Sequence, residues 1–194
     1  MASGADQMHA QRLISNAPVA PFKTQLLKWI GSKQKFAHEI IAHLPRDFGT
    51  YYEPFLGSAG VMATLAPHRA LGSDAFGPLI EIWQTLSTDP AALKRWYETR
   101  WQTYHAGDRV AGYEAIKAAY NARPNGADFL FLTRSCYGGV VRFRKKNGHM
   151  STPCGAHDPM LPARFARRVD LWHKRLQGAR FAQMDYHEAM AMAQ

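Results

Sequence analysis

The sequence predicts an α/β protein built on a parallel sheet, and three observations support this prediction. The 194 residues are 46% hydrophobic and 20% charged, which is typical of a globular domain and not of a disordered or fibrous chain. Between residues 51 and 86, short β-prone segments alternate with segments of helical periodicity. A glycine-rich turn joins the first strand to the first helix of that region. This order is typical of a βαβα unit that starts a doubly wound sheet.

Each element of the unit has its own local signal. Apolar residues recur at helical spacing over residues 35–44, and Pro45 ends the predicted helix. The unit itself then contains a strand at 50–52 that ends at Glu53, a glycine-rich turn at 57–60, a helix at 61–65, a strand at 70–73 that ends at Asp74, and a helix at 78–86.

Composition changes after residue 90, where a mostly helical insertion is predicted over residues 91–177. Its expected elements are a helical region at 91–122 interrupted near Gly107, a short apolar run at 128–132, half of a hairpin at 138–143 with a turn at 146–148, and an amphipathic helix at 163–177. Residues 179–184 are expected to return to the sheet as a further strand.

The positive charge is concentrated in this insertion. Lys and Arg total 24 against 15 Asp and Glu, a formal net charge of +9, and residues 94–180 hold 17 of the basic and only 6 of the acidic residues. Residues 129–157 contain no acid, and their basic residues are interleaved with glycines, Tyr137 and Phe143. A solvated surface run is one explanation. The mixture of stacking and phosphate-neutralising groups favours a nucleic-acid surface.

The cysteines indicate a reduced, cytoplasmic compartment, because two are too few for a disulfide framework. A zinc site made of Cys136, His149, Cys154 and His157 is an alternative, but the spacing matches no common zinc finger. We therefore expect no metal.

The N-terminal residues 1–20 lack the order of a signal peptide and are expected to form a flexible tail. No run approaches ~18 consecutive apolar residues, so no membrane span is expected.

Two acidic residues at successive strand ends indicate which kind of ligand the glycine-rich turn could bind. Glu53 precedes the turn, where a carboxylate would repel a pyrophosphate and attract an ammonium group. Asp74 follows about 20 residues later, where such sheets place a carboxylate that accepts from ribose hydroxyls. The pattern favours an amino-acid-bearing cofactor over a dinucleotide, although a purely structural turn is the alternative.

Five motifs in order resemble the Dam-type, D12-class DNA adenine-N6 methyltransferases. Residues 27–33 (LKWIGSK) are similar to the family's LKWxGGK motif, and residues 52–60 (YEPFLGSAG) to YxEPFLGGGAV. Asp74 with Leu79 and Ile80 is similar to the acidic strand end and the following helix. Residues 129–143 resemble FLYLNR...YNG..R, and residues 184–186 (MDY) the later DF motif.

The resemblance implies a Rossmann-like sheet that binds S-adenosylmethionine, formed by residues 21–90 and 178–194, with residues 91–177 as the target-recognition insertion. It implies that the cofactor would be bound by Trp29, Lys33, Glu53, Phe55, Gly57, Ser58, Asp74 and Asp185. Within this set, Glu53 and the turn would hold the methionine moiety, Asp74 the ribose and Asp185 the adenine region. Trp29 as a core aromatic, Lys33 as a surface charge and Asp185 as a helix cap are the alternatives.

The resemblance also implies double-stranded DNA as partner, with a flipped adenine as methyl acceptor. The residues expected to contact DNA are Arg134, Tyr137, Arg142, Arg144, Lys145 and Lys146. Phosphate contacts would supply affinity, and base-edge contacts would supply sequence preference.

The sequence departs from the family pattern in one functional motif. None of the 11 prolines are adjacent, so the catalytic [DN]PP[YFW] motif is absent, and we expect no catalytic residue in this chain. The sheet is therefore expected to be incomplete at its C-terminus and the chain inactive alone. A non-catalytic nucleic-acid-binding protein, or one half of a split enzyme completed by a second chain, are the alternatives. Ser32 and Ser58 also replace family glycines.

Overall fold

The computed structural model describes residues 19–193, so nearly all of the predicted tail at residues 1–20 lies outside the described residues. The fold is built on a parallel sheet in the order β1-β2-β3, formed by β1 (Tyr51–Glu53), β2 (Ala70–Asp74) and β3 (Ala179–Gln183). All three strands were predicted, and their carboxyl ends meet at one edge of the sheet because every pairing is parallel. The predicted α/β class is confirmed.

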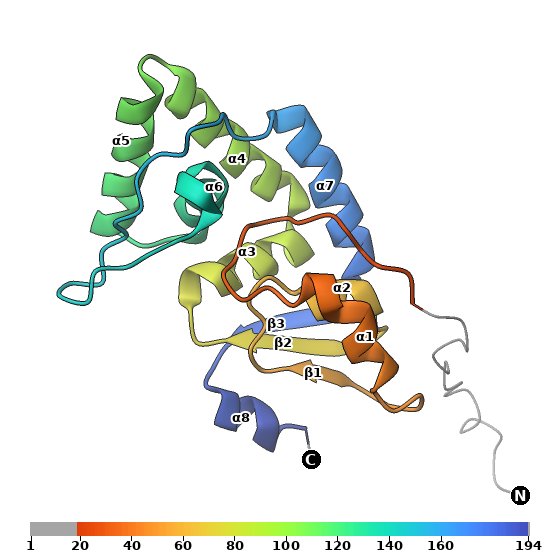
Figure 1. Cartoon of the computed structure of the whole chain (residues 1–194). Coiled ribbons are helices and arrows are strands. Elements are labelled where there is room, and N and C mark those ends of the chain that lie inside the picture. The colour runs from red at the N-terminus through yellow and green to blue at the C-terminus, as the bar shows by residue number, and fades with distance from the viewer. Residues whose placement is uncertain (1–18, 194) are drawn as a thin grey trace, which may run out of the picture.

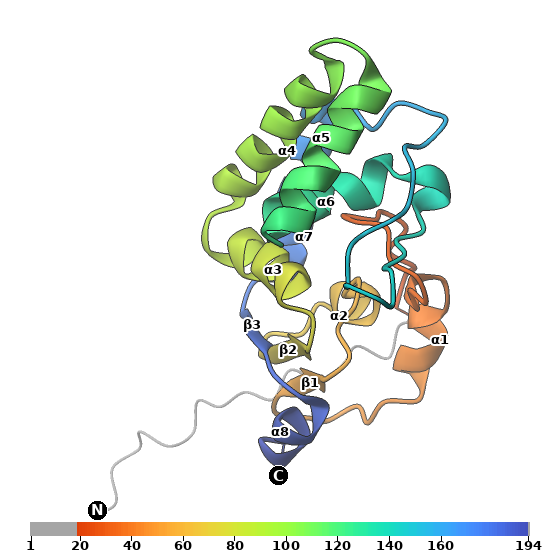
Figure 2. The same ribbon diagram turned by 90° about the vertical axis from the view of Figure 1, so that its left-hand side faces the viewer.

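Helices cover both sides of the sheet, as Figure 2 shows: α1 (Ala37–Ala42) and α2 (Gly60–Leu65) lie on one side, and α3 (Gly77–Thr88) lies on the other. A short 3-10 turn, η1 (Gln34–Phe36), leads into α1. The final helix, α8 (Tyr186–Ala191), lies below the sheet in Figure 1. This arrangement is the doubly wound layering that the βαβα pattern predicts.

Four further helices gather above the sheet in Figure 1: α4 (Pro90–His105), α5 (Arg109–Ala122), α6 (Gly126–Ser135) and α7 (Pro162–Arg175). The break predicted near Gly107 is the turn between α4 and α5, where Asp108 caps α5 by accepting from Ala111 N at 2.8 Å. The run at 128–132 belongs to α6, a helix whose side chains are buried on nearly every side.

One hydrophobic core joins the sheet to the helices of residues 91–177. Trp83 of α3 packs against Trp172 of α7 with ring centroids 5.4 Å apart, and Tyr97 of α4 stacks on Phe165 of α7 at 3.9 Å. The same cluster of buried side chains continues to Phe181 of β3. The insertion is therefore held to the sheet by a continuous apolar interior.

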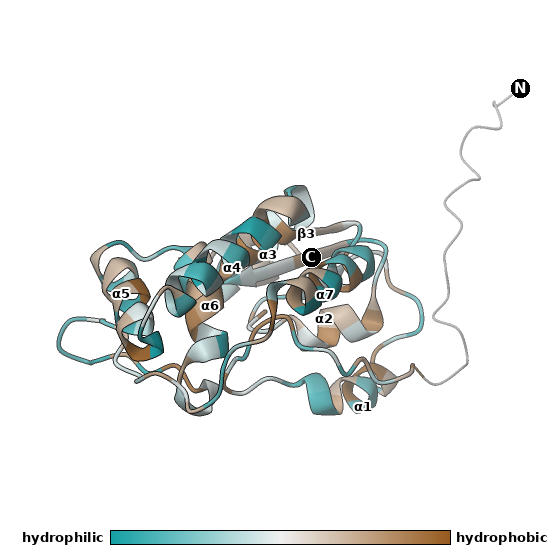
Figure 3. Ribbon diagram, turned by 90° about the horizontal axis from the view of Figure 1, so that it is seen from above, coloured by the Kyte–Doolittle hydropathy of each residue, from teal (hydrophilic) through white to brown (hydrophobic). Residues whose placement is uncertain are grey.

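Residues 136–154 form an extended ribbon, here called the arm, that begins with the short turn η2 (Tyr137–Gly139). Its two sides pair at Cys136↔Cys154 and Phe143↔Met150, and Arg144 N donates to His149 O at 2.9 Å around the predicted turn. The tip projects past α5 and is hydrophilic in Figure 3. No helix among residues 19–193 is long and apolar enough to cross a membrane.

Candidate functional site: a hollow at the edge of the sheet and a basic arm

The turn between β1 and α2 is held by hydrogen bonds from the neighbouring strand and helix. Gly57 N donates to Asp74 Oδ2 at 3.0 Å, and Trp83 Nε1 donates to Gly57 O at 3.0 Å. Gly57 has φ +48, and a Cβ there would lie 3.0 Å from the Trp29 ring. Both the left-handed backbone and the close approach of the ring therefore favour glycine at this position.

A shallow hollow opens in front of this turn, with about 310 Å³ of empty space when the open solvent at its mouth is included. Six of the eight predicted cofactor residues line it, namely Trp29, Lys33, Glu53, Phe55, Gly57 and Ser58. The structure thus brings together residues that are up to 29 positions apart in the sequence, from Trp29 to Ser58.

Trp29 and residues 31–33 form one wall of the hollow. Gln34 Nε2 donates to Phe22 O at 2.7 Å and Thr24 O at 2.6 Å, which folds the segment 22–34 back on itself. Ser58 Oγ donates to Ser32 Oγ at 2.8 Å, so the two serines that replace family glycines bond to each other across the hollow. Gln34 was not predicted as a site residue, because its only signal in the sequence is its place directly after the motif at residues 27–33.

Glu53 is the partly buried acid of the hollow. Its Oε2 accepts from Met62 N of α2 at 3.0 Å and from the Tyr51 hydroxyl at 3.3 Å. Burial raises the pKa of the Glu53 carboxyl to about 7, against an ordinary 4.5, although both hydrogen bonds act in the opposite direction. A cation placed beside this carboxyl would favour its ionised form.

The other two predicted acids, Asp74 and Asp185, are not among the residues that line the hollow. Asp74 accepts from Gly57 N through Oδ2 and from Phe76 N through Oδ1 at 3.1 Å, so it orients the glycine turn. Asp185 is exposed and caps α8 by accepting from His187 N at 2.9 Å, which is the helix-cap role left open by the sequence. Met184 N donates to Asp74 O at 3.3 Å, which brings the segment before Asp185 next to Asp74.

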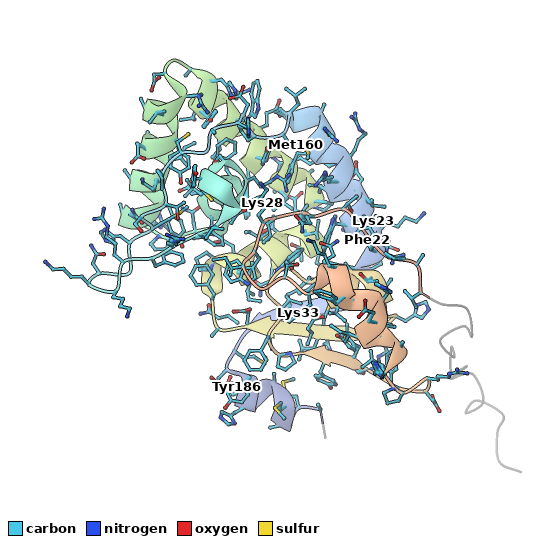
Figure 4. All side chains as sticks on the ribbon, in the orientation of Figure 1. Phe22, Lys23, Lys28, Lys33, Met160 and Tyr186 are labelled. Carbon is cyan, nitrogen blue, oxygen red and sulfur yellow. The ribbon has the colours of Figure 1, made fainter. Side chains whose placement is uncertain are left out.

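Trp29 and Lys33 occupy the opposite wall. Trp29 is half-buried, lines the hollow and also packs against Phe76 and Phe129 with ring centroids 5.9 and 6.0 Å apart, so it is both a core aromatic and part of the hollow. Lys33 is exposed, and its Nζ donates to Gly31 O at 3.0 Å. Figure 4 places Lys33 beside the sheet, on the segment that also carries Lys28.

Five of the six predicted DNA residues are exposed on the arm: Tyr137, Arg142, Arg144, Lys145 and Lys146. Tyr137 is 63% exposed. Phe143 between them packs against Phe76 with ring centroids 5.7 Å apart. Because Phe76 also touches Trp29, an aromatic chain connects the arm to the hollow, a link that the sequence analysis missed.

Arg134 is the exception and corrects the sequence-based expectation. Its Nη1 donates to Gln25 O at 3.1 Å and Leu26 O at 2.9 Å, and its guanidinium lies over the Phe165 ring. Burial lowers the pKa of Arg134. Its charge is used inside the fold to hold residues 22–34 in place, so it does not belong to the exposed basic surface of the arm.

No three His, Cys, Asp or Glu side chains gather closely enough to bind a metal ion within the part of the chain that the structure describes. In particular, Cys136 and Cys154 are free thiols that face each other across the arm.

A parallel sheet with a glycine-rich turn after one strand and an acid ending the next is typical of Rossmann-like proteins, a class that binds its ligands at the carboxyl edge of the sheet. Residues 29–194 match the family model of the D12 class N6 adenine-specific DNA methyltransferases, and the chain belongs to this family.

Three curated relatives show the extent of the likeness. A DNA adenine methylase of Vibrio cholerae serotype O1 is 29% identical over 177 residues, covering 87% of this chain and 60% of that protein. A DNA N-6-adenine-methyltransferase of Escherichia phage P1 is 29% identical over 133 residues, covering 66% and 17%. The type II methyltransferase M.MjaIII of Methanocaldococcus jannaschii is 26% identical over 158 residues, covering 72% and 53%. The chain therefore spans at most about three fifths of the length of these relatives.

Proposed function

We propose that this polypeptide binds S-adenosylmethionine and duplex DNA as part of an adenine-N6 DNA methyltransferase. The observation that carries the proposal is the partly buried Glu53 carboxyl, which lines a hollow at the carboxyl edge of the sheet beside a glycine turn that Asp74 orients. A desolvated acid with a raised pKa in a concave site is a functional-site signal with a physical cause.

The residues of the hollow fit this cofactor. Glu53 would bind the ammonium of the methionine moiety, because that cation offsets the desolvation of the carboxylate. Lys33 at the mouth would pair with the cofactor carboxylate, and Gly57 lets the backbone approach closely. Asp74 would accept from the ribose hydroxyls, and Asp185 would lie at the adenine region. When bound, the cofactor supplies an activated methyl group on its sulfonium.

The arm would bind the DNA. Arg142, Arg144, Lys145 and Lys146 are exposed on a ribbon whose described residues carry no acid, so they can neutralise backbone phosphates. Tyr137 offers an exposed aromatic ring for stacking. Because the proposed substrate is DNA, we also propose that the protein acts in the cytoplasm.

Methyl transfer to a flipped adenine requires acceptors for the amino group, which a [DN]PP[YFW] segment supplies in the family. The 194 residues contain no such segment, so we propose that this chain alone does not transfer methyl groups and that a further polypeptide segment completes the site. This segment belongs either to the same protein or to a second chain.

The open edge of β1 is the place where such a segment would add. Within residues 19–193, β1 pairs with β2 alone. The other edge strand is covered, because Gln84 Nε2 donates to Phe181 O at 2.9 Å and Ser87 Oγ to Ala179 O at 3.5 Å. A strand added beside β1 would end next to Glu53 and the hollow.

Calorimetry with S-adenosylmethionine tests the cofactor half of the proposal. We expect the 194-residue chain to bind it, and Glu53→Ala to weaken binding about tenfold or more because a charge-assisted contact is lost. Glu98→Gln, on the exposed face of α4, is the matched control that should bind normally. Absence of binding by the wild-type chain would refute the assignment of the hollow.

A tritium-transfer assay tests the catalytic half. The chain alone should transfer no methyl groups to unmethylated adenine-containing duplex, and addition of the polypeptide that bears the missing motif should restore transfer. Transfer by the 194-residue chain alone would overturn the proposed need for a completing segment. If the chain instead binds duplex DNA but not the cofactor, the alternative of a non-catalytic nucleic-acid-binding protein is favoured.

A further inference from the structure

Cys136 and Cys154 lie directly opposite each other at the base of the arm, in an antiparallel bridge. Two hydrogen bonds flank this pair: Tyr137 N donates to Pro153 O at 2.8 Å, and Gly155 N donates to Ser135 O at 2.8 Å. The cysteines themselves exchange no backbone hydrogen bond in this pattern, so they form a non-hydrogen-bonded pair. In such a pair the Cα atoms approach to about 4.5 Å, and both side chains point to the same face of the ribbon.

This backbone geometry is within the range that a disulfide needs. Bridged cysteines have Cα atoms about 4.4–6.8 Å apart, with Cβ vectors that converge. Closure of the pair would therefore require side-chain rotation and no rearrangement of the arm.

The backbone around both thiols is anchored independently of any disulfide. Cys136 ends α6 through its N–H, which donates to Leu132 O at 2.9 Å. On the other side, Arg109 Nη1 of α5 donates to Gly155 O at 2.9 Å, and the Tyr104 hydroxyl lies 3.5 Å from Cys154 Sγ. The reduced protein thus already holds the two cysteines in register, which lowers the entropic cost of joining them.

We propose that Cys136 and Cys154 are a reversible dithiol–disulfide pair whose oxidation closes the base of the arm covalently. The closed ring would contain every arm residue from Tyr137 to Pro153, including the four exposed basic side chains. The proposal depends on the register of the arm and not on cofactor or DNA binding.

The oxidant is a low-molecular-weight disulfide such as glutathione disulfide. Cys154 reacts first because it is half-buried, whereas Cys136 is 4% exposed and burial raises its pKa to about 11. The Cys154 thiolate attacks the small disulfide, which forms a mixed disulfide and releases one glutathione thiolate. The Cys136 thiolate then attacks the Cys154 sulfur and displaces the second. Two protein thiols are oxidised and one small disulfide is reduced to two thiols, since the two protons lost by the cysteines are taken up by the two glutathione thiolates.

Formation of the disulfide can be measured directly, because trypsin cuts the chain at the basic residues that lie between the two cysteines. The full chain is incubated with glutathione disulfide, treated with maleimide, and its mass is measured. We expect a product lighter than the reduced chain by two hydrogen atoms, without maleimide or glutathione. Trypsin cuts after Arg142, Arg144, Lys145 and Lys146, so the peptides that carry Cys136 and Cys154 should stay linked until dithiothreitol is added.

A matched variant keeps two thiols but shifts one of them. In Cys154→Ser combined with Pro153→Cys, the second thiol moves by one residue and points to the opposite face of the ribbon. This variant should accumulate a glutathione adduct and show no linked peptides. A second control places cysteines at Phe143 and Met150, the other non-hydrogen-bonded pair of the arm, in a chain without Cys136 and Cys154.

The outcomes are distinct. Closure of the native pair but not of the shifted pair supports the proposal. Wild-type chain that retains glutathione on Cys154, takes up maleimide at both thiols or cross-links to a second chain would overturn it. A disulfide that forms between cysteines at positions 143 and 150, but not between Cys136 and Cys154, would also overturn the proposal. It would show that the strand pairing of the arm is as described and that the native cysteines nevertheless cannot form a disulfide.

Discussion

Replacement of Glu53 by glutamine should remove a large part of the pH dependence of this protein's stability. Burial raises the pKa of Glu53 to about 7 in the folded chain, whereas an exposed glutamate in the unfolded chain has a pKa of 4.5. The folded state therefore binds a proton more tightly than the unfolded state. The stability that depends on the protonated carboxyl is fully present below pH 4.5 and is lost as the pH rises through about 7.

The gap between the two pKa values corresponds to about 3 kcal/mol in the free energy of unfolding, most of which falls between pH 5 and pH 8. Urea unfolding followed by tryptophan fluorescence measures this at both pH values. Glutamine keeps an acceptor for Met62 N, which the Glu53 carboxylate engages at 3.0 Å, but it cannot ionise. The free energy of unfolding of wild type minus that of Glu53→Gln should therefore fall by roughly 2 to 3 kcal/mol from pH 5 to pH 8.

Glu98→Gln is the control, because Glu98 is exposed on α4 and its substitution should give a difference from wild type that changes little with pH. An equal difference between wild type and Glu53→Gln at pH 5 and pH 8 would refute the conclusion that burial dominates the environment of this carboxyl.

Three other predictions concern the turn, the core and the arm. Gly57→Ala should lower the free energy of unfolding in urea by about 1 kcal/mol, because φ at this position is +48. It should also weaken cofactor binding in calorimetry, because the new Cβ meets the Trp29 ring. Unchanged cofactor affinity would argue that Trp29 and Gly57 do not contact the cofactor. Asp128→Ala should destabilise the fold by about 3 kcal/mol, because the Arg100 guanidinium would lose the largely buried carboxylate that lies 2.8 Å from its Nε. A cost below about 1 kcal/mol would show that this ion pair behaves as an exposed one. Lys145→Gln with Lys146→Gln should reduce the slope of log affinity for duplex DNA against log salt by about 2, whereas Lys174→Gln on the exposed face of α7 should leave it unchanged; equal slopes for the arm variant and wild type would exclude phosphate contacts from these lysines.

The strands and most helices could be predicted from the sequence because their signals are local. Strand ends at Glu53 and Asp74, a proline after Asp89 and an interruption near Gly107 each mark a boundary within a few residues. Helix α6 was predicted only as an apolar run, because a helix buried on nearly all sides has no polar face and so no periodicity.

The sequence predicted which residues belong to the candidate site, but not the contacts that these residues make with one another. The motifs identified Trp29, Lys33 and Glu53, and the structure brings all three to one hollow. The bond between Ser58 and Ser32 could not be foreseen, since a motif departure is visible in sequence while the contact that accommodates it is not. The same limit applies to Arg134, whose charge suggested DNA and whose partners are backbone carbonyls of residues 25 and 26.

The sequence by itself determined the order of strands and helices, the two acids at the ends of β1 and β2 and the family to which the chain belongs, because these depend on neighbouring residues and short motifs. Only the tertiary structure decided which basic residues face solvent on the arm and which support the interior, that Cys136 lies opposite Cys154, and that Glu53 is desolvated enough to hold a proton near pH 7. Exposure, pairing and protonation depend on what surrounds a side chain in space. Those surroundings come from segments that are distant in the sequence.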